Sequence, residues 1–260
     1  NPEDPLPETS LLTKFRTQRL RDISMDAIIT EIVRQCLEKN IIKGNNGIII
    51  DSTHIEANTV RKVPERIMKQ LAKNIFKAAG QEEYQIPDYT QIKDHTKAKQ
   101  VMKEYLEELI EKTDQEDCEN TSQAIQEARE ILDSDLFIEQ RGIRSLVDKD
   151  ARVGHKSKTQ HFYGYKTEIC QTTDGGLITG LTVEPGSYVD GSNFKELLTE
   201  TQKSGLTVSS VYGDKAYFRY DILDLIKKNQ ITPYIPVSAS SYRINEELFE
   251  YNKDSDQWFC

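Results

Sequence analysis

The chain has 260 residues, of which 37% are hydrophobic and 30% charged, a composition that fits one globular domain with an insertion or two small domains. No apolar run approaches the roughly 20 residues of a membrane span and no signal peptide opens the sequence, so we expect a cytoplasmic protein that does not enter a membrane. The formal net charge of −9, taken alone, argues against nucleic-acid binding.

Residues 1–46 predict an N-terminal helical segment. Ser10 precedes apolar residues at helical spacing and is a candidate cap, and a second helix is expected from Asp22 to Asn40. The sequence Gly44-Asn-Asn-Gly47 is typical of a turn. The β-branched run that follows it predicts a strand from Ile48 to about Ile55.

This strand contains an acidic residue, Asp51, directly after three isoleucines. An unpaired carboxylate buried in an apolar strand costs several kcal/mol, since even a neutral polar group costs roughly 2–7 kcal/mol. The residue therefore predicts a cation or a charged partner beside it. The alternative is an aspartate at a strand end that caps a turn through Ser52 and Thr53.

Residues 62–149 predict a helical insertion between the first and second strands. Its first helix is expected to open at Pro64, because proline is favoured in the first helical turn. A second helical stretch is expected around residues 101–109 and a third from Thr121 to Glu130, on the spacing of their apolar residues.

The charges of the chain are unevenly distributed. Residues 61–77 hold six basic and one acidic side chains, residues 104–139 thirteen acidic and two basic, and residues 141–166 seven basic and two acidic. An acidic average can therefore hide a basic face. The first basic segment carries four cations on one side of its helix, toward either DNA or solvent: Arg66, Lys69, Lys73 and Lys77.

The second basic segment is interpreted as a loop whose side chains contact phosphates. The candidate DNA-binding residues are Arg152, His155, Lys156, Lys158, Lys166 and, further along the chain, Lys215. Such contacts hold the nucleic-acid backbone without reading its sequence. The alternative is an ordinary solvated basic loop. A zinc site is not expected, because the six-residue spacing of His155 and His161 is unusual for a ligand pair.

After Asp150 the hydrophobic period changes to two, which predicts strands. The strand, turn and helix signals give, in order, a strand at 161–170, a turn at 173–176, a strand at 177–183, a helix at 193–203, a strand ending at Asp214, a helix at 218–228, a strand at 231–237 and two short strands at 247–251 and 257–260. Without the insertion the order is βββαβαβ, which suits an α/β fold with a mixed sheet.

Asp214 is the second candidate catalytic and metal-binding residue. It ends a strand 163 positions after Asp51, in Val211-Tyr-Gly-Asp214-Lys-Ala-Tyr217. The alternative is a cap for the helix expected near Phe218. Two such aspartates predict one Mg²⁺ site that is assembled by folding, because Mg²⁺ takes oxygen ligands.

Several runs resemble the RNase H-like DDE transposases of bacterial insertion sequences. The runs that carry the resemblance are Ile50-Asp-Ser-Thr-His-Ile-Glu-Ala-Asn58, Asp150-Ala-Arg-Val-Gly-His-Lys-Ser-Lys158 with Phe162-Tyr-Gly-Tyr-Lys166, Val183-Glu-Pro-Gly-Ser-Tyr-Val-Asp190, and the Asp214 strand. Found in this order, they are far more specific than any one of them alone.

The resemblance implies an RNase H-like core formed by residues 47–61 and 150–238, with the helical insertion at 62–149 and the start of a β-rich insertion at 239–260. Asp51 and Asp214 would hold Mg²⁺ or Mn²⁺ for phosphoryl transfer on DNA. The family also has a glutamate as third carboxylate, and no residue here matches it. We therefore expect a piece of a longer protein, with that acid beyond Cys260.

The function implied is a DNA transposase that binds transposon ends and target DNA, cuts and joins strands, and assembles as a homo-oligomer. Two alternatives remain open. The first is a catalytically inactive DNA-binding remnant that lacks the third acid. The second is a Mg²⁺-dependent nuclease of the same fold, which would hydrolyse DNA without joining it.

Overall fold

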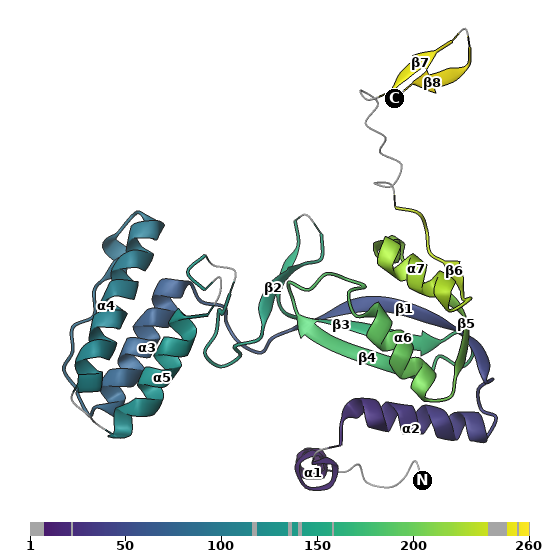
Figure 1. Ribbon diagram of the computed structural model, residues 1–260. Helices are drawn as coiled ribbons and strands as arrows, with labels where there is room; N and C mark the ends of the chain where they lie inside the picture. Colours follow the sequence, from purple (N-terminus) through teal and green to yellow (C-terminus); the bar gives the residue numbers. More distant parts are fainter. Residues whose placement is uncertain are drawn as a thin grey trace. The chain divides into compact units, whose positions relative to one another are not determined.

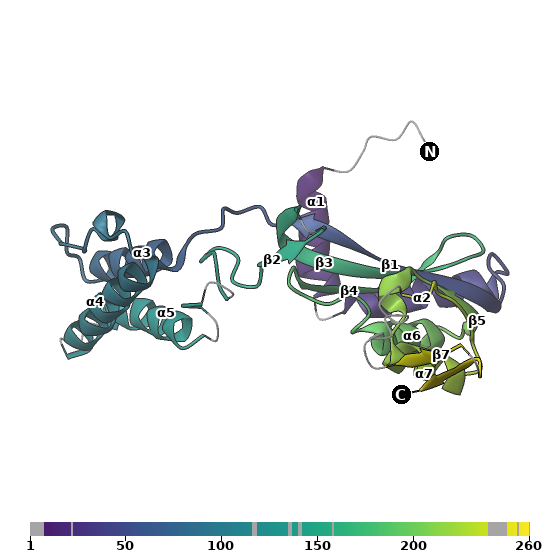
Figure 2. The same cartoon turned by 90° about the horizontal axis from the view of Figure 1, so that it is seen from above.

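A computed structural model describes residues 8–21, 23–115, 119–134, 137–139, 142–157, 159–238, 249–253 and 255–259. The chain divides into two compact units (Figures 1 and 2). The first unit comprises residues 1–53, 167–182 and 189–260, and the second comprises residues 54–166 and 183–188. The predicted residue Lys158 and the terminal Cys260 lie outside the described residues.

The N-terminal part of the first unit is helical, as predicted. Helix α1 (Thr9–Lys14) continues as a π-helix, Phe15–Leu20. The predicted cap was wrong, because Ser10 lies inside α1 and Glu8 occupies the cap position. Helix α2 (Met25–Glu38) is capped by Ser24, whose Oγ accepts a hydrogen bond from the backbone N–H of Ala27 at 3.2 Å.

One mixed sheet contains most of the strands, which confirms the predicted α/β class. Its strand order is β2-β3-β1-β5-β6, and β4 also pairs with β3. The strands are β1 (Asn45–Glu56), β2 (Arg152–His155), β3 (His161–Thr172), β4 (Ile178–Pro185), β5 (Thr207–Tyr212) and β6 (Thr232–Tyr234). β5 is parallel to both β1 and β6, whereas β2 and β3 are antiparallel.

Strand β2 corrects a prediction, because the segment that contains it was interpreted as a loop. The four residues of β2 pair with the start of β3, from Arg152 opposite Gly164 to His155 opposite His161. Strand β6 is shorter than expected, and its proline fits a position at the edge of the sheet.

The core of the first unit lies between its sheet and its helices. Ile48 and Ile50 of β1 are 1% exposed and pack with residues of β5, α2, α6 (Phe194–Lys203) and α7 (Tyr220–Lys228). Ile49, between them, is 36% exposed. Because successive side chains of a strand point to opposite faces, Asp51 falls on the exposed face with Ile49. The cost of burying an unpaired carboxylate therefore does not apply to this aspartate.

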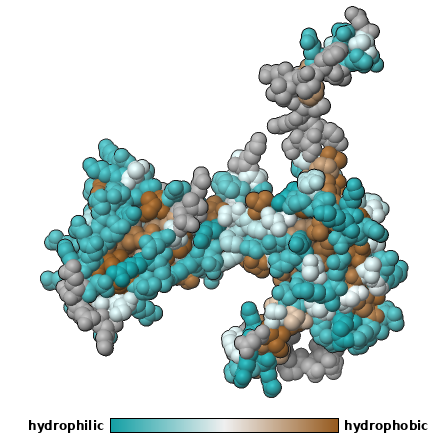
Figure 3. Space-filling model, viewed as in Figure 1, coloured by the Kyte–Doolittle hydropathy of each residue, from teal (hydrophilic) through white to brown (hydrophobic). Residues whose placement is uncertain are grey.

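The second unit has its own core between three helices that were all predicted. These are α3 (Pro64–Ala78), α4 (His95–Gln115) and α5 (Ser122–Leu132), which lie side by side in both views (Figures 1 and 2). Their apolar stripes meet in a cluster that includes Ile67, Leu71, Met102 and Ile125. Hydrophilic side chains cover much of the visible face of these helices (Figure 3).

Near the end of the chain, β7 (Glu250–Asn252) and β8 (Gln257–Phe259) form a separate antiparallel pair. This pair agrees with the two short strands that were expected there, although residues 247, 248 and 260 lie outside the described part. Within the described ranges, no helix is both long enough and apolar enough to cross a membrane.

Candidate functional site

Asp51 lies within β1, and Asp214 follows the end of the neighbouring parallel strand β5 by two residues. Ile48 of β1 is opposite Val211 of β5, and Ile49 is opposite Tyr212. Continued for two residues along each chain, this register places Asp51 opposite Asp214. Adjacent strands lie about 4.8 Å apart. Both aspartates belong to the first unit and both are exposed.

Asp51 lies inside β1 and not at its end, since the strand continues to Glu56. Its Oδ1 accepts a hydrogen bond from the backbone N–H of Ser52 at 2.8 Å. It lines a shallow depression of about 180 Å³ together with Ile49, Ser52, Thr53, Ile169 and Gln171. The alternative of a turn cap at a strand end therefore does not describe this residue.

Asp214 caps a single turn of 3-10 helix, Lys215–Tyr217, in which its Oδ1 accepts a hydrogen bond from the backbone N–H of Ala216 at 2.8 Å. The predicted alternative of a cap is thus partly right, although the capped element is this turn and not α7. Within the described part of the chain, the second oxygen of Asp51 and that of Asp214 accept no hydrogen bond.

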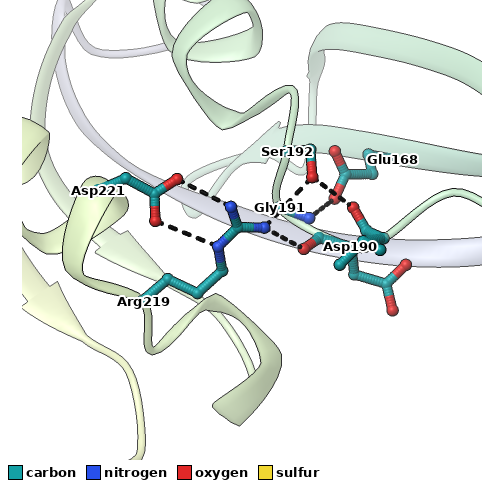
Figure 4. A network of polar contacts seen from close by, with 7 residues as sticks. Glu168, Asp190, Gly191, Ser192, Arg219 and Asp221 are labelled. Carbon is teal, nitrogen blue, oxygen red and sulfur yellow. Dashed lines mark hydrogen bonds and ion pairs between the residues drawn. The ribbon is translucent and has the colours of Figure 1, made fainter.

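A buried carboxylate on β3, Glu168, was missed by the sequence analysis. It is 1% exposed, and its Oε1 accepts a hydrogen bond from the hydroxyl of Tyr217 at 3.0 Å. The same oxygen accepts the backbone N–H of Gly191, a contact drawn in Figure 4. A signal for it was available, because Glu168 falls on the same alternating face of the strand as Phe162 and Cys170, which are both buried.

Tyr217 links this buried carboxylate to the aspartate pair. Burial raises the pKa of its hydroxyl well above the ordinary value, and the negative charge of Glu168 raises that pKa further. Asp190 and Asp51 act on the Tyr217 pKa in the same direction. The hydroxyl therefore stays protonated and donates to Glu168 from the last residue of the turn that Asp214 caps.

Arg219 holds the turn that carries Asp190. Its guanidinium forms two hydrogen bonds to the carboxylate of Asp221, at 3.1 and 2.9 Å. Its Nη1 donates to the backbone oxygen of Asp190 and to Oγ of Ser192, both at 3.2 Å (Figure 4). This network fixes the backbone that supplies the N–H of Gly191 to Glu168.

The donor chemistry of the aspartate pair fits a divalent cation. Carboxylate oxygens are the ligands that Mg²⁺ prefers, and Mg²⁺ keeps several waters when only one or two carboxylates hold it. Among the described residues, no group of three or more His, Cys, Asp or Glu side chains is arranged to hold a metal ion. The site is therefore a pair of carboxylates and not a closed cage.

The predicted DNA-binding residues are divided between the two units. Lys215 is exposed in the first unit, next to Asp214. The others that the structure describes lie in the second unit, where His155 and Lys166 line one pocket. Arg152 does not line it, because its Nη1 donates to the backbone oxygens of Lys149 and, at 2.9 Å, Ala151.

Among the described residues, the predicted position Lys156 does not line this pocket. Lys156 is exposed, and its backbone N–H donates to the oxygen of Gln160 at 2.9 Å across the β2–β3 turn. The Nδ1 atoms of His155 and His161 lie 2.9 Å apart on the paired strands. Lys158 is one of the residues that the structure does not describe.

Comparison with known proteins gives one match. The family model described as the transposase DDE domain matches residues 42–256, which is most of the chain. The match begins just before β1 and includes both candidate aspartates and the helices of the second unit. No curated protein matches the sequence, and no solved structure does either.

Proposed function

The chain belongs to the transposase DDE domain family, and from this membership we propose that it binds transposon ends and catalyses metal-dependent cleavage and joining of DNA strands. Membership of this family supports the general assignment of the chain as a transposase, which is a DNA-processing enzyme. The assignment of the chemistry to particular residues is our own.

The observation that carries this assignment is the parallel register of β1 and β5. It is the reason why two acidic residues 163 positions apart are expected at one place, Asp51 within β1 and Asp214 just after the end of the adjacent strand β5. Each keeps one carboxylate oxygen without a hydrogen bond to the described residues, on the solvent side of the sheet. That arrangement leaves an oxygen of each side chain available to a ligand.

In the proposed site, Asp51 and Asp214 hold Mg²⁺ or Mn²⁺, and backbone N–H groups orient their other oxygens. The bound cation would neutralise charge on the scissile phosphate and lower the pKa of the attacking hydroxyl. Buried Glu168 and Tyr217 act as positioning residues, because they tie β3 to the turn that follows Asp214.

We also propose that the sheet is the RNase H-like core of this enzyme and that α3, α4 and α5 are an insertion into it. The support is the order in which β4, β3, β1, β5 and β6 lie in the sheet, with the helical segment between β1 and the next core strand. Residues 47–61 and 150–238 remain the proposed core, and residues 62–149 the proposed insertion.

The first prediction concerns the aspartate pair. In the full-length protein, Asp51→Asn and Asp214→Asn should each lower the rate of strand cleavage by more than about 100-fold. Loss of a mere outer-shell partner of a metal ligand already costs up to about 100-fold, and these two residues are proposed as the ligands themselves. DNA affinity measured without divalent cation should stay unchanged. Gel analysis of oligonucleotides that carry transposon ends, with Mg²⁺ present, measures the cleavage rate.

The matched control is Asp133→Asn, which removes an exposed carboxylate at the end of α5 in the second unit. Normal cleavage by either Asp51→Asn or Asp214→Asn would refute the site. Cleavage by the wild type without any joined product would favour the nuclease alternative over the transposase.

A further inference from the structure

A basic pocket of about 690 Å³ lies within the second unit. Four cationic side chains and one histidine line it, and they come from four separate segments of the chain: Arg61, Lys62, Arg144, Lys166 and His155. No aspartate or glutamate is found among its described lining residues. Only His155 and Lys166 belong to the DNA-binding residues that the sequence predicted, so the other three are additions from the structure.

Arg144 is the unusual member of this group. Its side chain is buried, with the residue only 5% exposed, and Nη2 has no hydrogen-bond partner among the described residues. Nη1 makes a single long hydrogen bond, 3.4 Å, to the backbone oxygen of Ile143. Within the same described part of the chain, no carboxylate lies within 4.0 Å of its guanidinium nitrogens. The charge is thus buried without a close counterion.

Such a charge is costly, and an arginine cannot remove the cost by losing its proton. Burial lowers the pKa of Arg144 most, and the positive charges of Arg61 and Arg152 lower it further, against opposing effects of Tyr163 and Glu65. The guanidinium nevertheless remains charged at neutral pH. An anion that enters the pocket would supply the missing counterion and acceptor.

The backbone around Arg144 is held in place by hydrogen bonds. The backbone N–H of Lys62 donates to the oxygen of Arg144 at 2.8 Å. The hydroxyls of Thr59 and Ser145 lie 2.9 Å apart, and Ser145 Oγ also accepts the backbone N–H of Val147 at 3.1 Å. These contacts join the segment that follows β1 to the segment that precedes β2, so that the cations of both are presented together.

Two glycines leave the pocket without side chains at the place where its backbone segments meet. A Cβ atom at Gly154 would lie 2.3 Å from the oxygen of Gly186, and one at Gly186 would lie 2.5 Å from the oxygen of Arg152. The N–H of Gly186 donates to the oxygen of Gly164 at 2.8 Å. Both glycines line the pocket, and the close approach of these backbone segments requires a residue without a Cβ atom at both positions.

We propose that this pocket binds a phosphodiester of the DNA backbone, with Arg144 as the buried anchor and Arg61, Lys62 and Lys166 around it. The inference deepens the proposed function and rests on it. A phosphate group suits the pocket because a guanidinium fork can donate to two phosphate oxygens at once. The surrounding cations also attract the negative charge of the phosphate. Such a contact fixes the position of DNA without selecting its sequence.

The competing explanation is a structural role of Arg144 toward Glu65. Glu65 is 3% exposed, and its Oε2 also has no hydrogen-bond partner among the described residues. If Arg144 served only to compensate this buried acid, its loss would lower stability and leave DNA binding alone. The experiment therefore measures stability and DNA affinity separately.

The test is the affinity of the 260-residue chain for a short fluorescein-labelled duplex of arbitrary sequence, followed by fluorescence anisotropy without divalent cation over a series of salt concentrations. Arg144→Gln should weaken binding about tenfold or more, as expected for loss of hydrogen bonds to a charged partner. It should also reduce the slope of log affinity against log salt by about 0.9, the value for one phosphate contact. Arg144→Lys should recover only part of the affinity, because it keeps the charge and loses the fork.

Lys62→Gln keeps the test decisive if Arg144→Gln does not fold, because it removes a cation of the pocket that is only partly buried. It should weaken DNA binding in the same direction. Its matched control is Lys97→Gln, which removes an exposed lysine of α4 that does not line the pocket. Equal affinities and salt slopes for these two variants would overturn the proposal.

Inorganic phosphate, titrated at constant ionic strength, distinguishes a free anion from a DNA phosphate. If inorganic phosphate competes with DNA only at concentrations far above the Kd for DNA, the result supports binding of a DNA phosphodiester. Tight phosphate binding that Arg144→Gln abolishes, together with unchanged DNA affinity, would assign the pocket to a free phosphate and overturn the proposal. An unchanged DNA affinity in the pocket variants would refute the phosphodiester pocket without bearing on the aspartate site. Normal cleavage by Asp51→Asn would refute the aspartate site without bearing on the pocket. The failure of one proposal can therefore be told from the failure of the other.

Discussion

At the scale of single residues, the alternation of β1 decides what Asp51 can do. Ile48 and Ile50 fill the core, and Asp51 falls on the opposite face, where water solvates its carboxylate. The sequence predicted the strand correctly, but it could not assign the face on which Asp51 lies, because three consecutive isoleucines hide the period of two. Glu168 is the reverse case, a carboxylate that lies on the buried face and depends on donors from distant segments.

A prediction at this scale concerns the partner of Glu168. Tyr217→Phe removes the hydroxyl that donates to Glu168 and leaves a buried carboxylate with one donor fewer. We expect a loss of about 1–3 kcal/mol in the free energy of unfolding. Urea unfolding of both proteins at neutral pH measures the difference.

The matched control is Tyr220→Phe, because Tyr220 is 85% exposed in the first turn of α7. It should change the unfolding free energy by less than about 0.5 kcal/mol, as is usual for surface positions. Equal stabilities of the two variants would show that the hydroxyl of Tyr217 does not support Glu168.

A second residue-scale prediction concerns pH. Burial, with a further effect of Asp148, raises the pKa of Tyr165 to about 12 from the model-compound value of 10.0, and its hydroxyl donates to Asp148. Because the folded-state pKa is the higher one, the stabilisation is complete below the unfolded-state pKa and is lost as the pH rises through the folded-state value.

The difference in unfolding free energy between the wild type and Tyr165→Phe should therefore be constant from neutral pH to about pH 10 and should shrink between about pH 10 and pH 12. Urea titrations at a series of alkaline pH values provide this comparison. A difference that stays constant through that interval, or that grows, would contradict the assigned shift.

At the scale of secondary-structure elements, local patterns predicted the long helices well but missed strand β2. The apolar stripe and the first-turn proline of α3 sufficed for its prediction, because they are encoded within the helix. Strand β2 has four residues, among them a glycine and a cation, and it exists only because the start of β3 pairs with it. A pairing partner of this kind cannot be read from the four residues themselves.

The close approach of β2 and the turn after β4 gives a prediction at this scale. Gly186→Ala would place a Cβ atom 2.5 Å from the oxygen of Arg152 and 3.0 Å from the oxygen of Gly164, so the backbone must move. We expect a loss of about 1–3 kcal/mol in unfolding free energy, the usual cost of overpacking. The comparison is Gly44→Ala, where an added Cβ meets nothing within 4 Å. Similar denaturation midpoints for the two variants would disprove the close approach.

At the scale of the whole molecule, the chain has two cores, and its units do not follow the boundaries of its strands. β1, β3 and β4 each contribute residues to both units, and the second unit combines the helices α3, α4 and α5 with β2. The predicted insertion at 62–149 ends before β2 begins, since the change of hydrophobic period was the only available signal. The assignment of segments to a common core depends on contacts between distant residues, which a period cannot reveal.

The net charge of the chain likewise does not reveal which charged side chains the fold brings together. A net charge of −9 conceals a pocket lined by four cationic residues, three of which the sequence did not single out. Arg144 escaped attention because nothing in its local sequence indicates burial. Its importance follows from the missing counterion, which only the folded arrangement reveals.

The account depends on Asp51 and Asp214 binding one divalent ion, and iron-directed cleavage of the protein tests this most directly. Fe²⁺ is supplied in place of Mg²⁺ with ascorbate and peroxide, and the backbone cuts made by the radicals are mapped by mass spectrometry. We predict cuts near both residues, and the loss of both sets in Asp51→Asn but not in Asp133→Asn. Cuts near only one of the two aspartates, or two sets that respond independently to Asp51→Asn and Asp214→Asn, would contradict a shared site.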